Sequence, residues 1–242
     1  MRYVVVDDAV IARQSGKSFT LSKHIKGLIY SLLSNQTKWN RIEPHLHEIN
    51  EAFFDYDVEL IKNKPGDYFE NALFQLKCGN RKTSAQMNSL HENIATFERL
   101  ASEYGSMDAF VTSAPAYEIV ILLSGIGSEN KLHQVGEALA WEYLRNVGID
   151  GAKPDLHMRK FLGSERIGAS PNVTASPQEV ILTVEALSAS SGLSLAAIDN
   201  LIWSFCADGY GEICTSNPKC GECVIKKYCN RGIKGIMEVN QK

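Results

Sequence analysis

The sequence lacks any long uncharged apolar run, and no stretch approaches the roughly 18 residues that a membrane-spanning helix requires. The apolar run at residues 3–6 is cut short by Asp7 and Asp8, which is unlike a secretory signal. We therefore expect an intracellular protein without a membrane partner. It would be cytoplasmic, and associated with the nucleoid if the source is bacterial.

An excess of positive charge is also lacking, since the formal net charge is −3 and the isoelectric point is near 6.1. A nucleic-acid partner would therefore require basic residues that are clustered. The 242 residues are 44% hydrophobic and 22% charged, which is ordinary for a folded protein and excludes disorder over most of the length. A chain of this length forms one large domain or two small ones.

Alternating β-branched runs are scarce, and residues 4–6 are the only plausible strand. Elsewhere the apolar residues recur at helical spacing, so the sequence predicts an all-α fold. The segment 116–124 is nearly all apolar, which predicts a buried helix. Helices are expected over residues 21–33, 41–53, 83–103, 116–124, 136–147, 155–162, 177–189 and 194–206. Short linkers are expected over residues 63–67, 105–115, 148–154 and 163–177.

Four of the six cysteines fall within sixteen residues, at the spacing C-x5-C-x2-C-x5-C. They are Cys214, Cys220, Cys223 and Cys229. A disulfide framework would spread its cysteines along the chain, whereas four thiolates at short spacing suit one metal centre. Zinc and an iron–sulfur cluster both use such ligands, and the spacing alone does not choose between them. Cys78 and Cys206 are expected to be small buried apolar residues.

The segment 121–162 contains two glycine-bearing turns, Gly125-Ile126-Gly127 and Leu132-His133-Gln134-Val135-Gly136, each followed by polar or helical sequence. A turn between two helices directs backbone N–H groups outwards, where they bind an anion such as phosphate. A plain turn with a glycine cap is the alternative. Asp155 follows Pro154 and precedes an apolar helix, so its local pattern predicts an N-cap.

Together these features resemble the helix-hairpin-helix DNA glycosylases, in particular the endonuclease III-like branch with an iron–sulfur loop. The resemblance runs from about residue 28 to 229. Its strongest part is the cysteine loop, where Trp203-Ser204-Phe205 and Tyr210-Gly211 precede Cys214. The first cysteine gap has five residues, whereas the family usually has six.

Two further motifs carry the resemblance. The turn at residues 132–136 lies nineteen residues before Asp155, which fits the family's hairpin-to-aspartate distance, whereas the Gly125–Gly127 register makes that distance about eight residues too long. We therefore prefer the later register, although Gln134 stands where the family has glycine. Residues 32–37 resemble the end of an early helix whose glutamine, here Gln36, approaches DNA.

The resemblance implies two helical lobes with a DNA-binding cleft between them. One lobe comprises residues 31–144, and the other comprises residues 1–30 with 145–242, including the cluster loop 214–229. It also implies a base-excision-repair glycosylase that hydrolyses the N-glycosidic bond of a flipped damaged or mispaired base in double-stranded DNA, as a monomer. Asp155 would be the catalytic residue, and the four cysteines would hold a 4Fe–4S cluster, with zinc as the alternative. The residues expected to contact DNA are Gln36, His133, Gln134, Val135, Gly136, Lys226 and Lys227.

One departure bears on the chemistry. Bifunctional members of the family carry a lysine just after the hairpin, which attacks the sugar and forms a Schiff base. Ala138 holds that position in the preferred register and Glu129 in the other, while Lys131 fits neither. The resemblance therefore implies a monofunctional glycosylase without this lyase step. The alternative is a catalytically degenerate DNA-binding protein that keeps the fold.

Two basic groups stand out in the acidic chain. Residues 219–242 carry six Lys and Arg against Glu222 and Glu238, which gives a basic end that either faces DNA or is a solvated tail. Lys77, Arg81 and Lys82 form a smaller group, either a DNA-facing loop or a polar turn.

Overall fold

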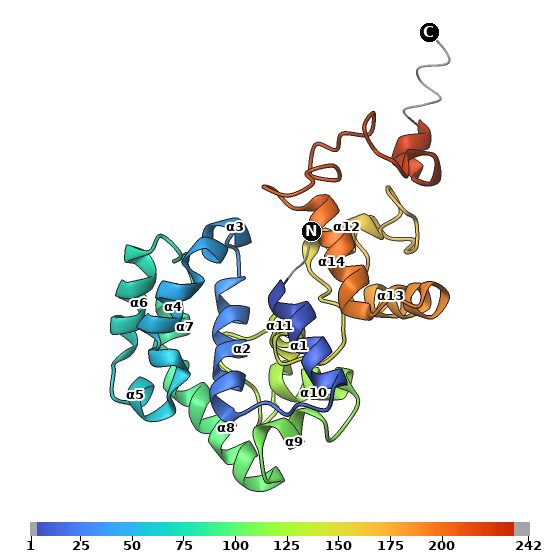
Figure 1. Cartoon of the computed structure of the whole chain (residues 1–242). Helices are drawn as coiled ribbons and strands as arrows, with labels where there is room; N and C mark the ends of the chain where they lie inside the picture. The colour runs from blue at the N-terminus through green and yellow to red at the C-terminus, as the bar shows by residue number, and fades with distance from the viewer. Residues whose placement is uncertain (1–3, 235–242) are drawn as a thin grey trace. The chain divides into compact units, whose positions relative to one another are not determined.

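The computed structural model describes residues 4–234, and every regular element in this range is a helix (Figure 1). The all-α prediction is therefore confirmed. The strand expected at residues 4–6 is wrong, because these residues begin helix α1 (Val4–Gln14). A run of three valines favours a strand only where another strand pairs with it, and the described residues contain none.

The chain divides into two compact units. We call residues 8–149 the hairpin unit, and residues 1–7 with 150–242 the cysteine unit. The division differs from the expected lobes, since residues 8–30 and 145–149 belong with the hairpin unit. The reason is that α2 (Leu21–Leu33) packs against α11 (Glu137–Asn146) with residues from both sides of position 30, as the bonds of His24 to Tyr143 and of Ser31 to Leu139 show.

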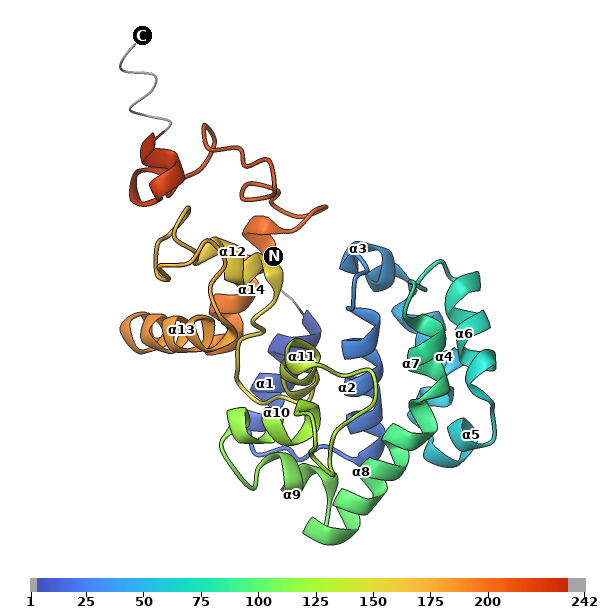
Figure 2. The same cartoon turned by 180° about the vertical axis from the view of Figure 1, so that it is seen from behind.

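The hairpin unit is built around α2, which lies between α11 and the helices α4 to α8 in both ribbon views (Figures 1 and 2). Thr20 caps α2 by accepting a hydrogen bond from the backbone of Lys23. Gly27 allows the close approach of α11, because a Cβ there would lie 2.9 Å from a methyl group of Val147. The other elements of this unit are α3 (Trp39–Ile42), η1 (Glu43–His45), α4 (Leu46–Ala52), η2 (Phe54–Tyr56), α5 (Val58–Lys62), α6 (Gly66–Gln75), α7 (Thr83–Asn88), α8 (Leu90–Tyr104), α9 (Met107–Val111) and α10 (Ala116–Ser124).

Several expected segments are more broken than their periodicity predicts. The segment 41–53 is divided among α3, η1 and α4, and Ser89 separates α7 from α8 within 83–103. The expected linker 105–115 contains α9, whose first turn is capped by Ser106. Helix α10 has the predicted bounds, but only one side is buried, since Tyr117 and Ile121 are exposed. Short helices of this kind are fixed by capping side chains and tertiary packing more than by apolar spacing.

A buried polar network joins four helices of the hairpin unit. The His24 ring of α2 contacts the Tyr143 hydroxyl at 2.7 Å and the Asp108 carboxylate at 3.3 Å. Arg13 donates to the same carboxylate and to the carbonyl of Val147. Burial lowers the pKa of His24. Burial acts to raise the pKa of Asp108, but hydrogen bonds from His24 and Arg13 and the Arg13 charge together lower it to about 2.

The cysteine unit packs α12 against α14 and α13 around an apolar core. Its helices are α12 (Leu156–Phe161), α13 (Pro177–Ser191), α14 (Leu195–Cys206) and the short η3 (Lys226–Tyr228). The core includes Met158, Val180, Val184, Ile198 and Cys206. Among the described residues no single helix is long and apolar enough to cross a membrane, although α13 and α14, which meet at 110°, pass that test as a bent pair.

Candidate functional site

Two successive turns lie between α10 and α11. The side chain of Ile126 in the first turn is completely exposed, whereas Leu132 and Val135 in the second are buried. Gly136 is the N-cap of α11, so the second turn leads directly into that helix. Of the two turns, the one at residues 132–136 therefore adjoins α11, and the one at residues 125–127 directly follows α10.

Gln134 adopts a left-handed backbone conformation with φ of +60°. This region costs a residue with a side chain about 1–2 kcal/mol and is normally occupied by glycine. Gln134 is also the position at which the family resemblance calls for glycine. The backbone at Gln134 thus has the conformation that glycine favours, although the residue is a glutamine.

Two side chains brace this turn from outside it. The buried Asn93 of α8 accepts from the His133 N–H at 2.7 Å and donates to the His133 carbonyl at 3.1 Å. The Lys131 ammonium donates to the carbonyls of Ser124 and Val135, at 2.7 and 3.3 Å, and so joins the end of α10 to the turn. Sequence reasoning missed Asn93, because it lies forty residues away and belongs to no recognised motif.

The N-terminus of α11 has one feature that favours the binding of an anion and one that opposes it. Gly136 offers no side chain to cap the first turn, so the helix dipole and its N–H groups favour a negative partner there. Glu137 places an acidic side chain in the same turn. Ala138 follows it and is half-buried. The electrostatic attraction of this turn for phosphate is therefore weaker than that of a helix start without an acid.

Asp155 is the N-cap of α12, as its local pattern predicts. Its Oδ1 atom accepts hydrogen bonds from the backbone N–H groups of His157 and Met158, at 2.8 and 3.1 Å. The other oxygen, Oδ2, accepts no hydrogen bond from any residue that the structure describes, and the side chain is half-buried. One oxygen thus fixes the carboxylate on the helix, while the other accepts no hydrogen bond from a described residue.

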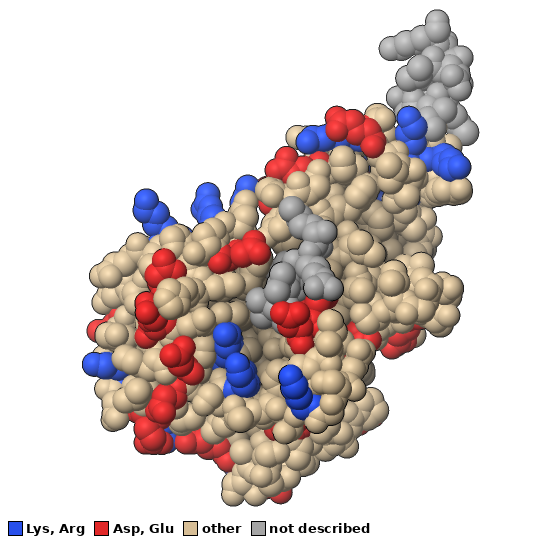
Figure 3. All heavy atoms as spheres, in the orientation of Figure 1, with Lys and Arg blue, Asp and Glu red and all other residues tan. Residues whose placement is uncertain are grey.

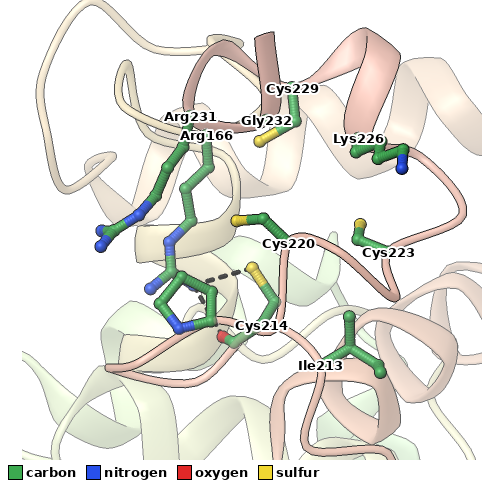
Figure 4. A pocket seen from close by; sticks show the side chains of 10 residues that line it. Arg166, Ile213, Cys214, Cys220, Cys223, Lys226, Cys229, Arg231 and Gly232 are labelled. Atoms are coloured by element: carbon green, nitrogen blue, oxygen red, sulfur yellow. Dashed lines mark hydrogen bonds between the residues drawn. The ribbon is translucent and has the colours of Figure 1, made fainter. Parts of the chain in front are cut away.

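The four clustered cysteines line one cavity of the cysteine unit (Figure 4). The free space of this cavity, its mouth included, is about 300 Å³. All four thiols are free, and Cys229 is buried while the other three are partly exposed. Within residues 4–234, no three or more His, Cys, Asp or Glu side chains are arranged to hold a metal ion as they stand. The four thiols nevertheless remain the residues that could hold a metal group in this unit.

Cys214 has the most polar surroundings of the four cysteines. A hydrogen bond with the buried Cys206 thiol, together with the charge and hydrogen bond of Arg166, lowers the pKa of Cys214 to about 6. The same interaction and burial raise the pKa of Cys206. Cys206 is buried in the apolar core, as expected, but its contact with Cys214 gives it a role that its isolated position in the sequence did not indicate.

Gln36 lies on a surface made by two loops of the hairpin unit. We call residues 34–41 and 77–82 together the two-loop surface. The Asn80 side chain joins the loops by donating to the Asn35 carbonyl and the Thr37 hydroxyl, and Arg81 donates to the Gln36 side chain at 2.6 Å. In both ribbon views the loop between α6 and α7 lies beside α3 (Figures 1 and 2).

The two-loop surface is uniformly positive. It carries five cationic residues and no acid, in a chain of net charge −3. All five are exposed, and Figure 3 shows Lys and Arg side chains projecting from this edge of the hairpin unit. These residues are Lys38, Arg41, Lys77, Arg81 and Lys82. The three cations of residues 77–82 lie close together in the sequence, but only the fold brings residues 38 and 41 beside them.

The second basic group belongs to the cysteine unit. Lys226 and Lys227 are exposed on η3, and the Lys227 ammonium lies 4.8 Å from the centre of the Tyr228 ring. Lys226 also lines the thiol cavity. Glu238 and Lys242, which belong to the same basic stretch, lie outside the described residues.

Comparison with known proteins bears mainly on the fold. No protein-family profile matches the chain, and no curated protein sequence matches it. The structure is similar to that of Methanocaldococcus jannaschii 8-oxoguanine glycosylase/lyase in complex with a 15mer DNA containing 8-oxoguanine. The TM-score is 0.53 and the identity 20%, over 83% of this chain and 88% of that chain. The chain thus has a helical DNA glycosylase fold.

Proposed function

We propose that this protein is a DNA glycosylase of base-excision repair. The observation that carries the proposal is the arrangement of Asp155, a half-buried carboxylate that is anchored to α12 through one oxygen only. The similarity to the fold of a glycosylase/lyase supports it. The substrate would be duplex DNA with a damaged or mispaired base.

The chemistry follows from the bond that breaks. The target base must first leave the stack, at a cost of a few kcal/mol that is smallest for bases already destabilised by damage or mismatch. As the N-glycosidic bond breaks, positive charge develops on the sugar, as in the hydrolysis of other glycosides. The anionic Asp155 would stabilise this charge and position the attacking water. Its cap bonds with α12 hold the carboxylate in place.

We further propose that the enzyme is monofunctional. Ala138 occupies the position after the hairpin at which lyases of this fold family carry lysine. Lys131 is the nearest amine in the sequence, but it donates to two backbone carbonyls at the base of the turn. A protonated ammonium held in this way is a poor nucleophile, because attack requires the neutral amine.

The hairpin unit would hold DNA through contacts to the phosphates of its backbone. The turn at residues 132–136, with Val135 and Gly136 at the start of α11, offers N–H groups to one phosphate. The two-loop surface offers several cations to others, and counterion release from such contacts supplies most of the non-specific affinity for DNA. Because the first turn of α11 includes the acidic Glu137, we expect the two-loop surface to supply the larger share of that affinity.

We propose that Cys214, Cys220, Cys223 and Cys229 hold a 4Fe–4S cluster. A single zinc ion would need all four sulfurs within about 2.3 Å of one point. A cluster with one thiolate on each iron instead takes ligands distributed around a cavity, which agrees with the thiols in Figure 4. When bound, the cluster would act structurally, by holding residues 213–232 in a fixed loop.

The proposal is tested with a panel of duplexes that contain uracil, thymine mismatches, alkylated purines or oxidised bases. We expect abasic product from at least one substrate. Asp155→Asn should reduce its formation about 100- to 10,000-fold, because asparagine keeps the N-cap but not the charge. Asp150→Asn is the matched control, since Asp150 caps α14 through the N–H groups of Leu195 and Ala196 in the same unit. Equal activity of Asp155→Asn and wild type would overturn the assignment of the aspartate.

A second function, DNA binding without catalysis, is favoured by one observation: an acid and an alanine, Glu137 and Ala138, occupy the first turn of α11. Wild-type protein that binds every duplex in the panel and releases no base from any of them would establish this function in place of the first.

A further inference from the structure

Arg166 lies in the loop after α12 and directs its guanidinium group at the cysteine loop. Its side chain donates to the Cys214 sulfur at 3.0 Å, to the Cys214 carbonyl at 2.7 Å and to the Thr215 carbonyl at 2.8 Å. Arg166 is only 9% exposed. Burying a guanidinium is costly unless its donors are satisfied, so these three bonds account for its position.

The loop that carries Arg166 is fixed at a second point. The Asn230 N–H donates to the Arg166 carbonyl at 2.7 Å, and the Asn230 side chain donates to the Ser164 carbonyl at 2.7 Å. Asn230 directly follows Cys229, the last of the four cysteines. The Arg166 side chain therefore bonds to the first cysteine of the loop, while its backbone bonds to the residue that follows the last cysteine.

Cys214 is distinguished from the other three cysteines by these contacts. Among the described residues, no side chain hydrogen-bonds to the sulfur of Cys220, Cys223 or Cys229. Arg231 also lines the cavity, but it is exposed and acts on Cys214 through its charge alone. The buried Arg166 thus holds Cys214 in place, whereas no side chain that the structure describes holds the sulfurs of the other three cysteines in this way (Figure 4).

We propose that Arg166 is a positioning residue for the cysteine centre, which holds Cys214 in its ligating place and stabilises the negative charge on its sulfur. This inference rests on the proposed cluster. Hydrogen bonds and positive charge at a ligating sulfur strengthen metal binding and shift the reduction potential of an iron–sulfur cluster upwards. Arg166 would therefore act on retention of iron and on the potential, and not on base excision directly.

The test uses the full chain, reconstituted with iron and sulfide under anaerobic conditions. Arg166→Met removes the charge and all three donors, Arg166→Lys keeps the charge with fewer donors, and Arg231→Met is the matched control in the same cavity. The readouts are iron and sulfide per chain, the rate of iron loss to a chelator followed by visible absorbance, and the reduction potential. Circular dichroism verifies that each variant is folded.

We expect Arg166→Met to hold iron about 10- to 100-fold less tightly than wild type, with a lower reduction potential. Arg166→Lys should lie between the two, and Arg231→Met, which removes a charge but no hydrogen bond to Cys214, should lose less iron than Arg166→Met. If Arg166→Met does not fold, the comparison of Arg166→Lys with Arg231→Met decides. The inference would be overturned if the Arg166 variants lost iron no faster than wild type. It would also be overturned if Arg231→Met lost iron as fast as Arg166→Met. Wild-type protein that binds no iron would instead refute the cluster itself, and the inference with it.

Discussion

The side chain of Asn93 bonds to both backbone groups of His133, so one buried amide on α8 fixes the turn that leads into α11. The next residue, Gln134, is in a left-handed conformation that a free chain rarely adopts. A strained residue persists only where its surroundings hold it, and Asn93 supplies that constraint. The shape of the hairpin therefore depends on a residue outside it.

Replacing Asn93 with alanine should destabilise the protein by about 1–3 kcal/mol, because a backbone donor and acceptor at His133 lose their partners in a partly buried site. Urea unfolding followed by circular dichroism would measure the change. Thr96→Ala is the control and should have a small effect, because the Thr96 hydroxyl bonds to the Glu92 carbonyl within the same helix. An Asn93→Ala protein as stable as the control would show that solvent replaces both bonds.

Replacing Gln134 with glycine should stabilise the protein by up to about 1 kcal/mol. Relief of the left-handed strain outweighs the added freedom of the unfolded chain. Gln134→Val should be destabilising, because a β-branched residue is least tolerant of positive φ. Glu129→Gly is the control, since Glu129 is exposed without a positive φ and glycine there should be neutral or destabilising. Urea midpoints that fall for Gln134→Gly would contradict the assignment of strain.

The sequence predicted the helices and caps that depend mainly on residues close together in the chain. The bounds of α2 and α10 follow from apolar spacing, and Asp155 caps α12 as its neighbours suggested. The prediction failed at residues 4–6, where strand preference had no partner strand to act on. It also failed at Ser89, which separates α7 from α8 within a continuous apolar pattern.

The contacts that define the candidate site were largely beyond prediction from a single sequence. Arg166 reaches Cys214 across 48 residues, and Asn93 reaches His133 across 40. Both are ordinary polar residues whose roles come from the fold, because neither lies at a fixed spacing from its partner. The cysteine spacing, in contrast, marked the thiol cavity directly, because the four cysteines that line it lie within sixteen residues of one another.

Acid should destabilise the hairpin unit in two steps. The pKa of His24 is lowered in the folded protein, so the unfolded chain takes up the proton first and stability falls as the pH drops below 6.5. The pKa of Asp108 is lowered to about 2, so further stability is lost between pH 3.8 and that value. Urea midpoints measured against pH would show both steps. His24→Gln should remove the first step and keep the second, and an unchanged first step would assign it to another group.

The two basic groups should differ in their contribution to DNA affinity. Arg81→Ala with Lys82→Ala should weaken binding of an undamaged duplex and reduce the slope of log affinity against log salt by up to about 0.9 per lost phosphate contact. Lys226→Ala with Lys227→Ala removes the same charge from the cysteine unit and should have the smaller effect. Fluorescence anisotropy at several salt concentrations measures both. A larger loss from the second pair would place the main phosphate contacts in the cysteine unit.

Borohydride reduction during base excision should trap no covalent complex with DNA. A Schiff base requires a neutral amine at the sugar, and the Lys131 ammonium is engaged by the carbonyls of Ser124 and Val135. Lys131→Met should therefore lower stability, through loss of the link between α10 and the turn, while base release per folded molecule stays near that of wild type. Denaturing gels of the borohydride reaction and single-turnover assays separate these effects. A trapped complex in wild type that disappears in Lys131→Met would identify Lys131 as a nucleophile, and the enzyme would then be bifunctional through an amine outside the usual register.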